Sequence, residues 1–258
     1  MRTHATRQAI AIAALFGSSG LALAEEQAPA EEAAMNDAEE QQIALRALNK
    51  MGSYLRSLDA FKVQAVTSTD EVLENGQKIQ FDRSVELQAK KPAGLRVDVT
   101  SPYGDRSLYF DGNTFTLQTP GNQFYATIPA TGTNAELIDA VQSKTGVNLP
   151  LVDLFRWGAD GDTGGEIESA IIVGYGNVNG VKCEHYAFRQ QEVDWQICIQ
   201  QGDTPLPLKL VITSKLEEEQ PQHVAVMKWD TAAAADDKAF AYSPKEGDTK
   251  ISFNPVTD

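Results

Sequence analysis

The sequence predicts an α+β fold: a single domain built on one long antiparallel sheet, with helices before and within it. Three observations predict this class. Apolar and polar residues alternate in many short segments, which is typical of strands with one dry and one wet face. Turn signals containing glycine separate several of these segments. Over residues 43–58 and 133–146 the apolar period lengthens to that of a helix.

The first element is an amphipathic helix over residues 43–58. Asp37 and Glu40 form a candidate capping box before it. Apolar residues then recur at steps of three and four along about five turns. They are Ile43, Ala47, Leu48, Met51, Leu55 and Leu58. Such a stripe needs an apolar surface to lie on, and the following strands can supply it.

Strands follow the helix without interruption. The predicted ones cover residues 61–67, 77–90, 94–100, 107–117 and 122–129. In the second of them Phe81, Val85 and their apolar neighbours share one face, with charged residues on the other. The segment 107–117 reads as a hairpin, because Asp111-Gly112-Asn113 offers the positive φ angles of a tight turn. These are the signals of an antiparallel meander.

In the middle of the chain the spacing of apolar residues changes from that of a strand to that of a helix. Residues 133–146 predict a helix that begins at Thr133 or Asn134 and ends at Gly146. Residues 149–158 predict a second, short helix, with Pro150 near its first turn. The glycine-rich segment 158–165 that follows predicts a hinge. Strands then resume over residues 168–176, 182–190, 193–200, 206–215 and 222–230.

The N-terminus predicts export. Residues 1–24 join a basic start to an apolar run and a small-residue cleavage pattern, which is typical of a secretory signal peptide. No cysteine follows the cleavage point, so we expect no lipid anchor. Residues 25–40 hold seven acidic and no basic residues and predict a disordered lead. The folded domain is then 41–258.

Composition excludes some partners. The chain has 36 acidic and 22 basic residues, a net charge of −14. Nucleic acid, which needs a basic surface, is therefore not expected as a partner. No segment after the signal approaches 18 consecutive apolar residues, so no transmembrane segment is expected in the mature chain.

Both cysteines lie in one predicted hairpin. With the turn at Gln190-Gln191, Cys183 falls directly opposite Cys198, within reach of a disulfide. Closing a loop of this size is worth about 3 kcal/mol in the chain-entropy model. Two buried thiols, or ligation of a metal together with His185, are the alternatives. A zinc site needs three or four ligands, and only His185 joins the two cysteines on their face of the hairpin, so the number of candidate ligands argues against zinc. On the other face we expect Tyr186, Phe188, Trp195, Ile197 and Ile199.

Motifs of known catalytic chemistry are missing from the sequence. It holds no nucleophile elbow, no phosphate-binding glycine loop and no zinc-protease motif. We therefore expect no enzyme, no cofactor and no metal; a hydrolase with an unrecognised site is the weakest alternative.

Arg83 is the one charged residue on the apolar face of its strand. A bulge at residues 82–84, or a guanidinium that reaches water from an apolar stem, would explain it structurally. The functional alternative is a charged hook that holds a lid carbonyl or a ligand head group inside an apolar cavity.

Several stretches carry a family resemblance: "NGQKIQF", "YFDGNTFTL", "YATIPATGT", "LPLVDLFRWG", "HYAFRQQEVDWQ" and "PLPLKLVIT". Over most of residues 45–255 the chain resembles an uncharacterised family of predicted periplasmic proteins, a domain of unknown function. In element order that family is similar to the lipoprotein carriers LolA and LolB. The resemblance implies a single curved antiparallel sheet, an unclosed half-barrel, with helices covering its concave face. It also implies a periplasmic location.

This resemblance implies a non-catalytic binding or carrier protein for a lipid, an acyl chain or a lipoprotein. The alternative is an envelope protein-interaction or sensor module of the same fold, with a polypeptide partner. We expect an apolar cavity under a helical lid, with Phe155 and Trp157 as plugs. The candidate cavity and lid residues are Phe81, Arg83, Val85, Val97, Phe155, Trp157, Tyr186, Phe188, Trp195 and Ile197.

Overall fold

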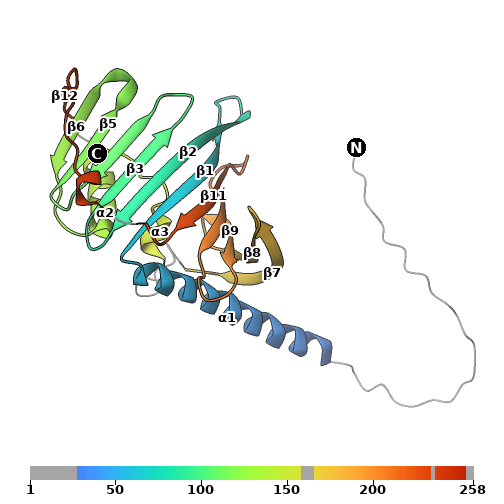
Figure 1. Ribbon diagram of the computed structural model, residues 1–258. Coiled ribbons are helices and arrows are strands. Elements are labelled where there is room, and N and C mark those ends of the chain that lie inside the picture. Colours follow the sequence, from blue (N-terminus) through green and yellow to red (C-terminus); the bar gives the residue numbers. More distant parts are fainter. Residues whose placement is uncertain (1–27, 158–165, 234–235, 254–258) are drawn as a thin grey trace, which may run out of the picture.

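The twelve strands of the computed structural model form one continuous, curved sheet (Figure 1), and the model describes residues 28–157, 166–233 and 236–253. The spatial order is β12-β6-β5-β4-β3-β2-β1-β11-β10-β9-β8-β7. The two outer strands, β12 and β7, do not pair with each other, so the sheet is unclosed. All neighbours are antiparallel except β12 and β6. The fold class predicted from the sequence is confirmed.

The first six strands form a meander on one side of the sheet. Their bounds are β1 (Ala60–Val72), β2 (Lys78–Lys90), β3 (Leu95–Thr100), β4 (Arg106–Phe110), β5 (Thr114–Thr119) and β6 (Phe124–Pro129). Each pairs with the next along the chain, as the alternation predicted.

The second meander lies on the other side of β1. Its strands are β7 (Ser169–Val178), β8 (Val181–Arg189), β9 (Val193–Gln200), β10 (Pro207–Ser214) and β11 (Gln222–Asp230). β11 pairs with β1 and so joins the two meanders through the first strand of the chain. The short β12 (Thr249–Ile251), which the sequence did not predict, pairs parallel to β6.

Three α-helices accompany the sheet: α1 (Ala28–Ser57), α2 (Asn134–Thr145) and α3 (Asp153–Arg156). Two short 3-10 helices cover Pro120–Asn122 and Asp237–Ala239. α2 begins with the predicted cap: Thr133 and Glu136 exchange side-chain to backbone hydrogen bonds. It ends at Gly146, whose φ of 66° is the left-handed conformation that glycine adopts without strain. α3 is shorter than its predicted span.

The prediction differs from the structure at α1. Residues 28–40 are helical, where the sequence predicted a disordered lead and a cap at Asp37. Alanine and glutamate, which make that stretch look solvated, are also among the strongest helix formers. The predicted signal peptide and the predicted hinge over 158–165 lie outside the described residues.

Candidate functional site

One side of the sheet, called the inner face below, is apolar and covered by the helices. Alternation along the strands turns Val63, Leu87 and Val97 to this side, side by side on neighbouring strands. Ile197 continues it in the second meander, opposite Tyr186 and Leu210. The inner face comprises chiefly Val63, Ala65, Val85, Leu87, Val97, Leu108, Tyr186, Phe188, Trp195, Ile197, Leu210 and Met227, all buried.

The helices fill the hollow of the inner face with their own side chains. α1 contributes Leu48, Met51 and Leu55, which recur on one stripe of the helix and are at most 4% exposed. α2 contributes Leu137 and Val141. α3 and the residue after it contribute the remaining cover, Leu154, Phe155 and Trp157. Full burial of each large apolar side chain stabilises the folded state by about 1.5–3 kcal/mol. The cover is therefore part of the core.

Ile43 behaves differently from the rest of the predicted stripe. It is 36% exposed, and Ala44 rather than Ile43 is buried against the sheet. The apolar stripe of α1 therefore meets the inner face from Ala44 onward.

Aromatic side chains gather where α3 meets the second meander. Phe188 and Trp195 face each other across β8 and β9 and stack with ring centroids 4.2 Å apart. The Trp195 indole N–H donates to the side-chain oxygen of Gln190 at 3.0 Å. Phe155 packs beside Phe61 of β1, with centroids 6.1 Å apart. The contact between Phe155 and Phe61 packs α3 against the sheet.

A hollow of about 210 Å³ opens at the same place. Its lining residues are mostly apolar, with three polar ones among them: Asp153, Arg156, Trp157, Gln190, Val193, Trp195, Leu210 and Ile212. Pockets for drug-sized ligands usually measure about 300–1,000 Å³. The space under the closed cover is thus smaller than a lipid-sized ligand requires.

The outer face of the sheet carries a larger hollow, of about 470 Å³, over β11, β1, β2 and β3. The side chains that alternation turns to this side are polar or charged: Lys62, Gln64, Glu86, Gln88, Arg96, Asp98, Lys228 and Asp230. The predicted apolar cavity has to be sought on the inner face, where the space is smaller.

The inner face becomes polar towards one end of β1 and β2. Thr67 is buried there directly opposite Arg83. Thr69 is the next residue of β1 on the same face, and its hydroxyl is 2.9 Å from Nδ1 of His223. The Arg83 side chain is 35% exposed, and its guanidinium is 3.9 Å from the Glu71 carboxylate. The register of β1 and β2 runs through Arg83 without a bulge, so the bulge explanation is wrong.

Asp153 of α3 and His223 of β11 influence each other electrostatically near this polar end. Burial raises the pKa of Asp153, while its own backbone, His223 and Arg156 oppose the shift. Burial lowers the pKa of His223, and Arg83 adds to this effect while Asp153 opposes it. Burial therefore shifts the pKa of each group in the direction that favours its neutral form, and the interaction between Asp153 and His223 opposes both shifts.

Hydrogen bonds fasten α2 to the sheet and α1 to the end of α3. The Asn134 side chain accepts from the backbone N–H of Gly94 at 3.0 Å and donates to the carbonyl of Lys90 at 3.0 Å. It thereby ties α2 to the turn between β2 and β3. Arg56 of α1 donates to the backbone carbonyl of Trp157 at 3.0 Å, which links α1 to the end of α3.

The predicted disulfide is confirmed, but the predicted hairpin register is wrong. Cys183 and Cys198 are bonded, with Cα atoms 5.5 Å apart. Cys183 lies opposite Gln200, and Cys198 opposite His185, so the bond joins a diagonal pair. The loop is Gln191-Glu192, one residue later than predicted, since the Gln190 N–H donates to the carbonyl of Val193.

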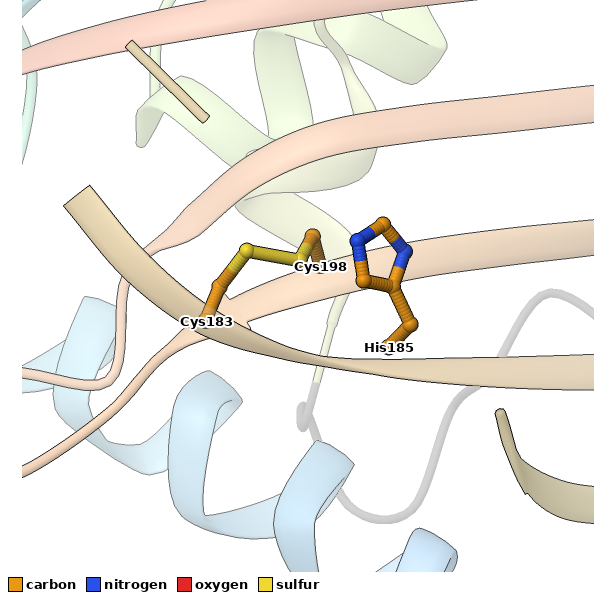
Figure 2. A group of neighbouring side chains, drawn as sticks. All are labelled: Cys183, His185 and Cys198. Carbon is orange, nitrogen blue, oxygen red and sulfur yellow. A yellow bond between two sulfur atoms is a disulfide. The ribbon is translucent and has the colours of Figure 1, made fainter. Parts of the chain in front are cut away.

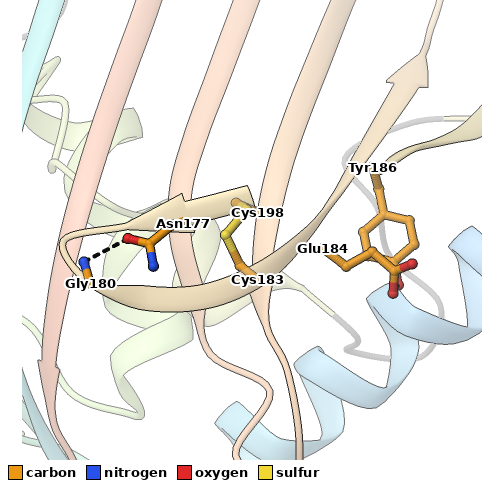
Figure 3. Close-up of a disulfide and its surroundings, with 6 residues drawn as sticks. All are labelled: Asn177, Gly180, Cys183, Glu184, Tyr186 and Cys198. Carbon is orange, nitrogen blue, oxygen red and sulfur yellow. Dashed lines mark hydrogen bonds between the residues drawn. A yellow bond between two sulfur atoms is a disulfide. The ribbon is translucent and has the colours of Figure 1, made fainter. Parts of the chain in front are cut away.

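This later loop changes the partners on the inner face: Tyr186 faces Ile197, and Phe188 faces Trp195, rather than Trp195 and Val193 as predicted. Figure 3 shows Tyr186 and Glu184 beside α1, with the Tyr186 hydroxyl 2.7 Å from the Glu184 carboxylate. The same view shows the disulfide close to the β7–β8 turn, where the Asn177 side chain accepts from the Gly180 N–H.

His185 lies beside the disulfide (Figure 2). The two sulfurs and a ring nitrogen lie within 4.8 Å of one another. Both sulfurs are used in the S–S bond, so they are not thiolate ligands for a metal. The imidazole also lies directly over Gly176, where an added Cβ would come within 2.4 Å of Nε2. The group is a packed structural cluster.

The predicted cavity and lid residues divide into three groups. Val85, Val97, Tyr186, Phe188, Trp195 and Ile197 are buried on the inner face, and Trp157 is buried in its cover. Phe155 is partly buried in the cover. Phe81 and Arg83 lie at the polar end, and Phe81 packs edge-on against Tyr103 with centroids 4.9 Å apart.

Sequence reasoning missed Asn134, Asp153, Gln190 and His223. Each gains its role from a partner far away in the sequence or, for Gln190, from the hairpin loop. No periodicity could have revealed these contacts. Their polar side chains at buried or half-buried positions were the only available signal.

The family model described as "Predicted periplasmic protein (DUF2092)" matches residues 44–254. This agrees with the family resemblance and with the periplasmic location predicted from the sequence. No curated protein matches the chain. Among the helices in the described ranges, none has the length and apolar character needed to cross a membrane.

Several solved structures are similar to this chain at low identity. MucB has 17% identity and a TM-score of 0.41, over 78% of this chain and 63% of MucB. The chain thus spans less than two thirds of MucB. The Mycobacterium tuberculosis lipoprotein LppX has 10% identity and a TM-score of 0.46, over 76% and 99%. A LolA superfamily protein from Nitrosomonas europaea has 10% identity and a TM-score of 0.38, over 77% and 97%.

Proposed function

The chain belongs to the DUF2092 family of predicted periplasmic proteins, and on that premise we propose that it binds and carries a hydrophobic ligand. The ligand is a lipid, an acyl chain or the acyl part of a lipoprotein. It is held by enclosure against the inner face, and no chemical step is involved.

The observation that carries this proposal is the nature of the cover. The inner face is covered by three helices on separate chain segments, each fastened by a few polar contacts. α3 is one turn long, and its end is tied to α1 through the Arg56 contact. Its Arg156 pairs with Asp139 of α2 at 2.9 Å. Because exposed ion pairs are worth about 0–1 kcal/mol, these polar contacts add little to the apolar packing that holds α3.

Displacement of α3 would make room for the ligand. The side chains that would leave, Leu154, Phe155 and Trp157, are themselves apolar. An acyl chain would take their place beside Trp195 and Leu210, which line the same hollow as Trp157, so the apolar area buried would change little between the two states. Reversible loading and release require such a near balance.

Native mass spectrometry of the protein purified from the periplasm, with organic extraction of anything bound, tests the proposal. We expect a discrete lipid mass, or uptake of added fatty acid, phospholipid or acylated peptide by the empty protein. An empty protein that takes up none of the three would refute it.

A second candidate function is an envelope module that binds a polypeptide. One observation favours it: β7, at the edge of the sheet, exposes apolar side chains and backbone groups. The two functions use different surfaces, the inner face for the lipid and the sheet edge for the polypeptide.

A further inference from the structure

The free edge of β7, called the open edge below, lacks the charged and proline residues that usually protect such an edge. Among the strands of the described ranges, β7 pairs with β8 on one side and with none on the other. Its ten residues, Ser169–Val178, include no charged residue and no proline. Natural edge strands are commonly shortened or carry lysine or proline, which prevents pairing with another chain. Two other devices are present here: a bulge between Ile172 and Gly174, and the helix α1, which packs against β7 and accepts from the Ile172 N–H through Glu40.

The other edge of the sheet follows the usual pattern. β12 has three residues, and Lys250 is its central one. A strand so short and charged offers little to another chain. The two edges of this sheet therefore differ in the protection that they carry.

Exposed apolar side chains line the open edge on both sides of the sheet. Ile171, Val173 and Tyr175 are 50%, 56% and 78% exposed. Ile171 pairs with Ala187 and lies on the outer side, whereas the register shift at the bulge pairs Tyr175 with Glu184, on the side of Tyr186. A partner strand could cover the outer-side residues with alternate residues of its own.

A carboxylate already occupies one backbone donor of this strand. The N–H of Ile172 donates to Oε1 of Glu40, on α1, at 2.7 Å. Glu40 therefore does what the carbonyl of a neighbouring strand would do. Backbone groups at this edge can thus reach an acceptor that does not belong to the sheet.

The surroundings of the open edge are acidic. Glu40 of α1 contacts β7, Asp37 and Glu39 precede it on the same helix, and Glu166 and Glu168 directly precede the strand. Figure 1 shows the N-terminal end of α1 reaching beyond β7. A second copy of the chain would bring the same acidic helix to the same place, where like charges repel. Basic residues on an incoming strand would instead be attracted.

We propose that the open edge binds an extended, basic segment of a partner protein by strand addition, with its backbone bonded to β7 and its apolar side chains over Ile171 and Val173. The inference is independent of lipid binding, because the inner face takes no part in it.

The test uses the mature protein and a labelled decapeptide, blocked at both ends, in which lysine alternates with valine and threonine. Fluorescence anisotropy measures its affinity, and hydrogen exchange locates it. We expect slower exchange over residues 169–178. Affinity should fall about tenfold or more when glutamate replaces lysine, or when alternate amides are N-methylated, because charge and backbone bonding are both lost.

Val173→Lys should also weaken binding by about tenfold, because it adds a charge to the edge. Val66→Lys is the matched control, since Val66 is equally exposed, at 58%, but lies on the central strand β1. Uptake of fatty acid should be unchanged in both variants, which separates this inference from the proposed carrier function.

Four results would overturn the inference: no binding at millimolar peptide and low salt, equal binding of the N-methylated peptide, unchanged affinity of Val173→Lys, or exchange protection elsewhere on the sheet. A dimer in sedimentation that Val173→Lys abolishes would also overturn it, because the occupant would then be a second copy.

Discussion

The two meanders on either side of β1 cover the same apolar face by different means. The first meander comprises β2 to β6 and packs with the helix α2. Among the described residues, Asn134 is the one whose side chain links α2 to these strands or their turns by hydrogen bonds. The second, β7 to β11, carries the disulfide and packs against the long α1. The comparison teaches that one half of the sheet is stabilised covalently and the other through non-covalent contacts, so they should respond differently to the same perturbation.

The largest expected effect on stability is in the first meander, which non-covalent contacts alone hold together. Phe110→Ala removes a side chain that is 1% exposed, and such substitutions cost about 3–5 kcal/mol of unfolding free energy. Urea unfolding followed by circular dichroism measures the change. The exposed Phe124, on β6 of the same half, is the matched control, and Phe124→Ala should cost far less. Equal losses of unfolding free energy in the two variants would show that burial does not determine the stability of this half.

Removing the covalent link should have the next largest effect. The double variant Cys183→Ala, Cys198→Ala leaves no unpaired thiol and should lose about 3 kcal/mol, because the link closes a loop between residues 15 apart. The same denaturation experiment measures it, with reductant on the wild type as a check. A loss below about 0.5 kcal/mol would contradict a stabilising role for the disulfide.

Asn134→Ala tests the fastening of α2. The change leaves the Gly94 N–H and the Lys90 carbonyl without this partner, at a cost of about 1–3 kcal/mol. Exchange of the α2 amides should accelerate more than exchange in β8 and β9. Asn148→Ala, at an exposed position after α2, should change stability by less than about 0.5 kcal/mol. Similar effects of the two substitutions would contradict the assigned role.

The smallest expected effect concerns pH. Because the pKa of His223 is lowered in the folded state, its contribution to stability is present above the ordinary histidine pKa. That contribution is lost as pH falls through the lowered value. His223→Gln should therefore reduce the loss of stability on acidification from neutral pH, measured as unfolding free energy at several pH values. An unchanged pH profile would exclude His223 as the responsible group.

Much of the fold could be predicted because half-buried antiparallel strands record their faces in the sequence. The bounds predicted for β9 and β11 match the structure. β12 was missed because its three residues are exposed and carry no alternating signal. The hairpin register was wrong by one loop residue, because the buried Gln190 bonds to Trp195 and so belongs to the strand end rather than to the loop.

The candidate site was less predictable than the fold. Alternation identified Val85, Val97 and Ile197 as inner-face residues, since that requires only local pattern. It could not reveal that Asp153 and His223 interact electrostatically, because α3 and β11 are far apart in the sequence. Arg83 was placed on the correct side of its strand, while its neighbours on β1 and β11 could not be foreseen.

The place of β1 between β2 and β11 has a consequence for the order of folding. One side of β1 can pair with β2 as soon as residue 90 is available, but its other side waits for residues 222–230. Until then the longest strands of the molecule present an unpaired edge in a chain that is still incomplete. Pairings so distant in sequence form slowly, and an unpaired edge invites aggregation. Joining of the two meanders is therefore the step at which we expect folding of this protein to be slowest and most in need of a chaperone.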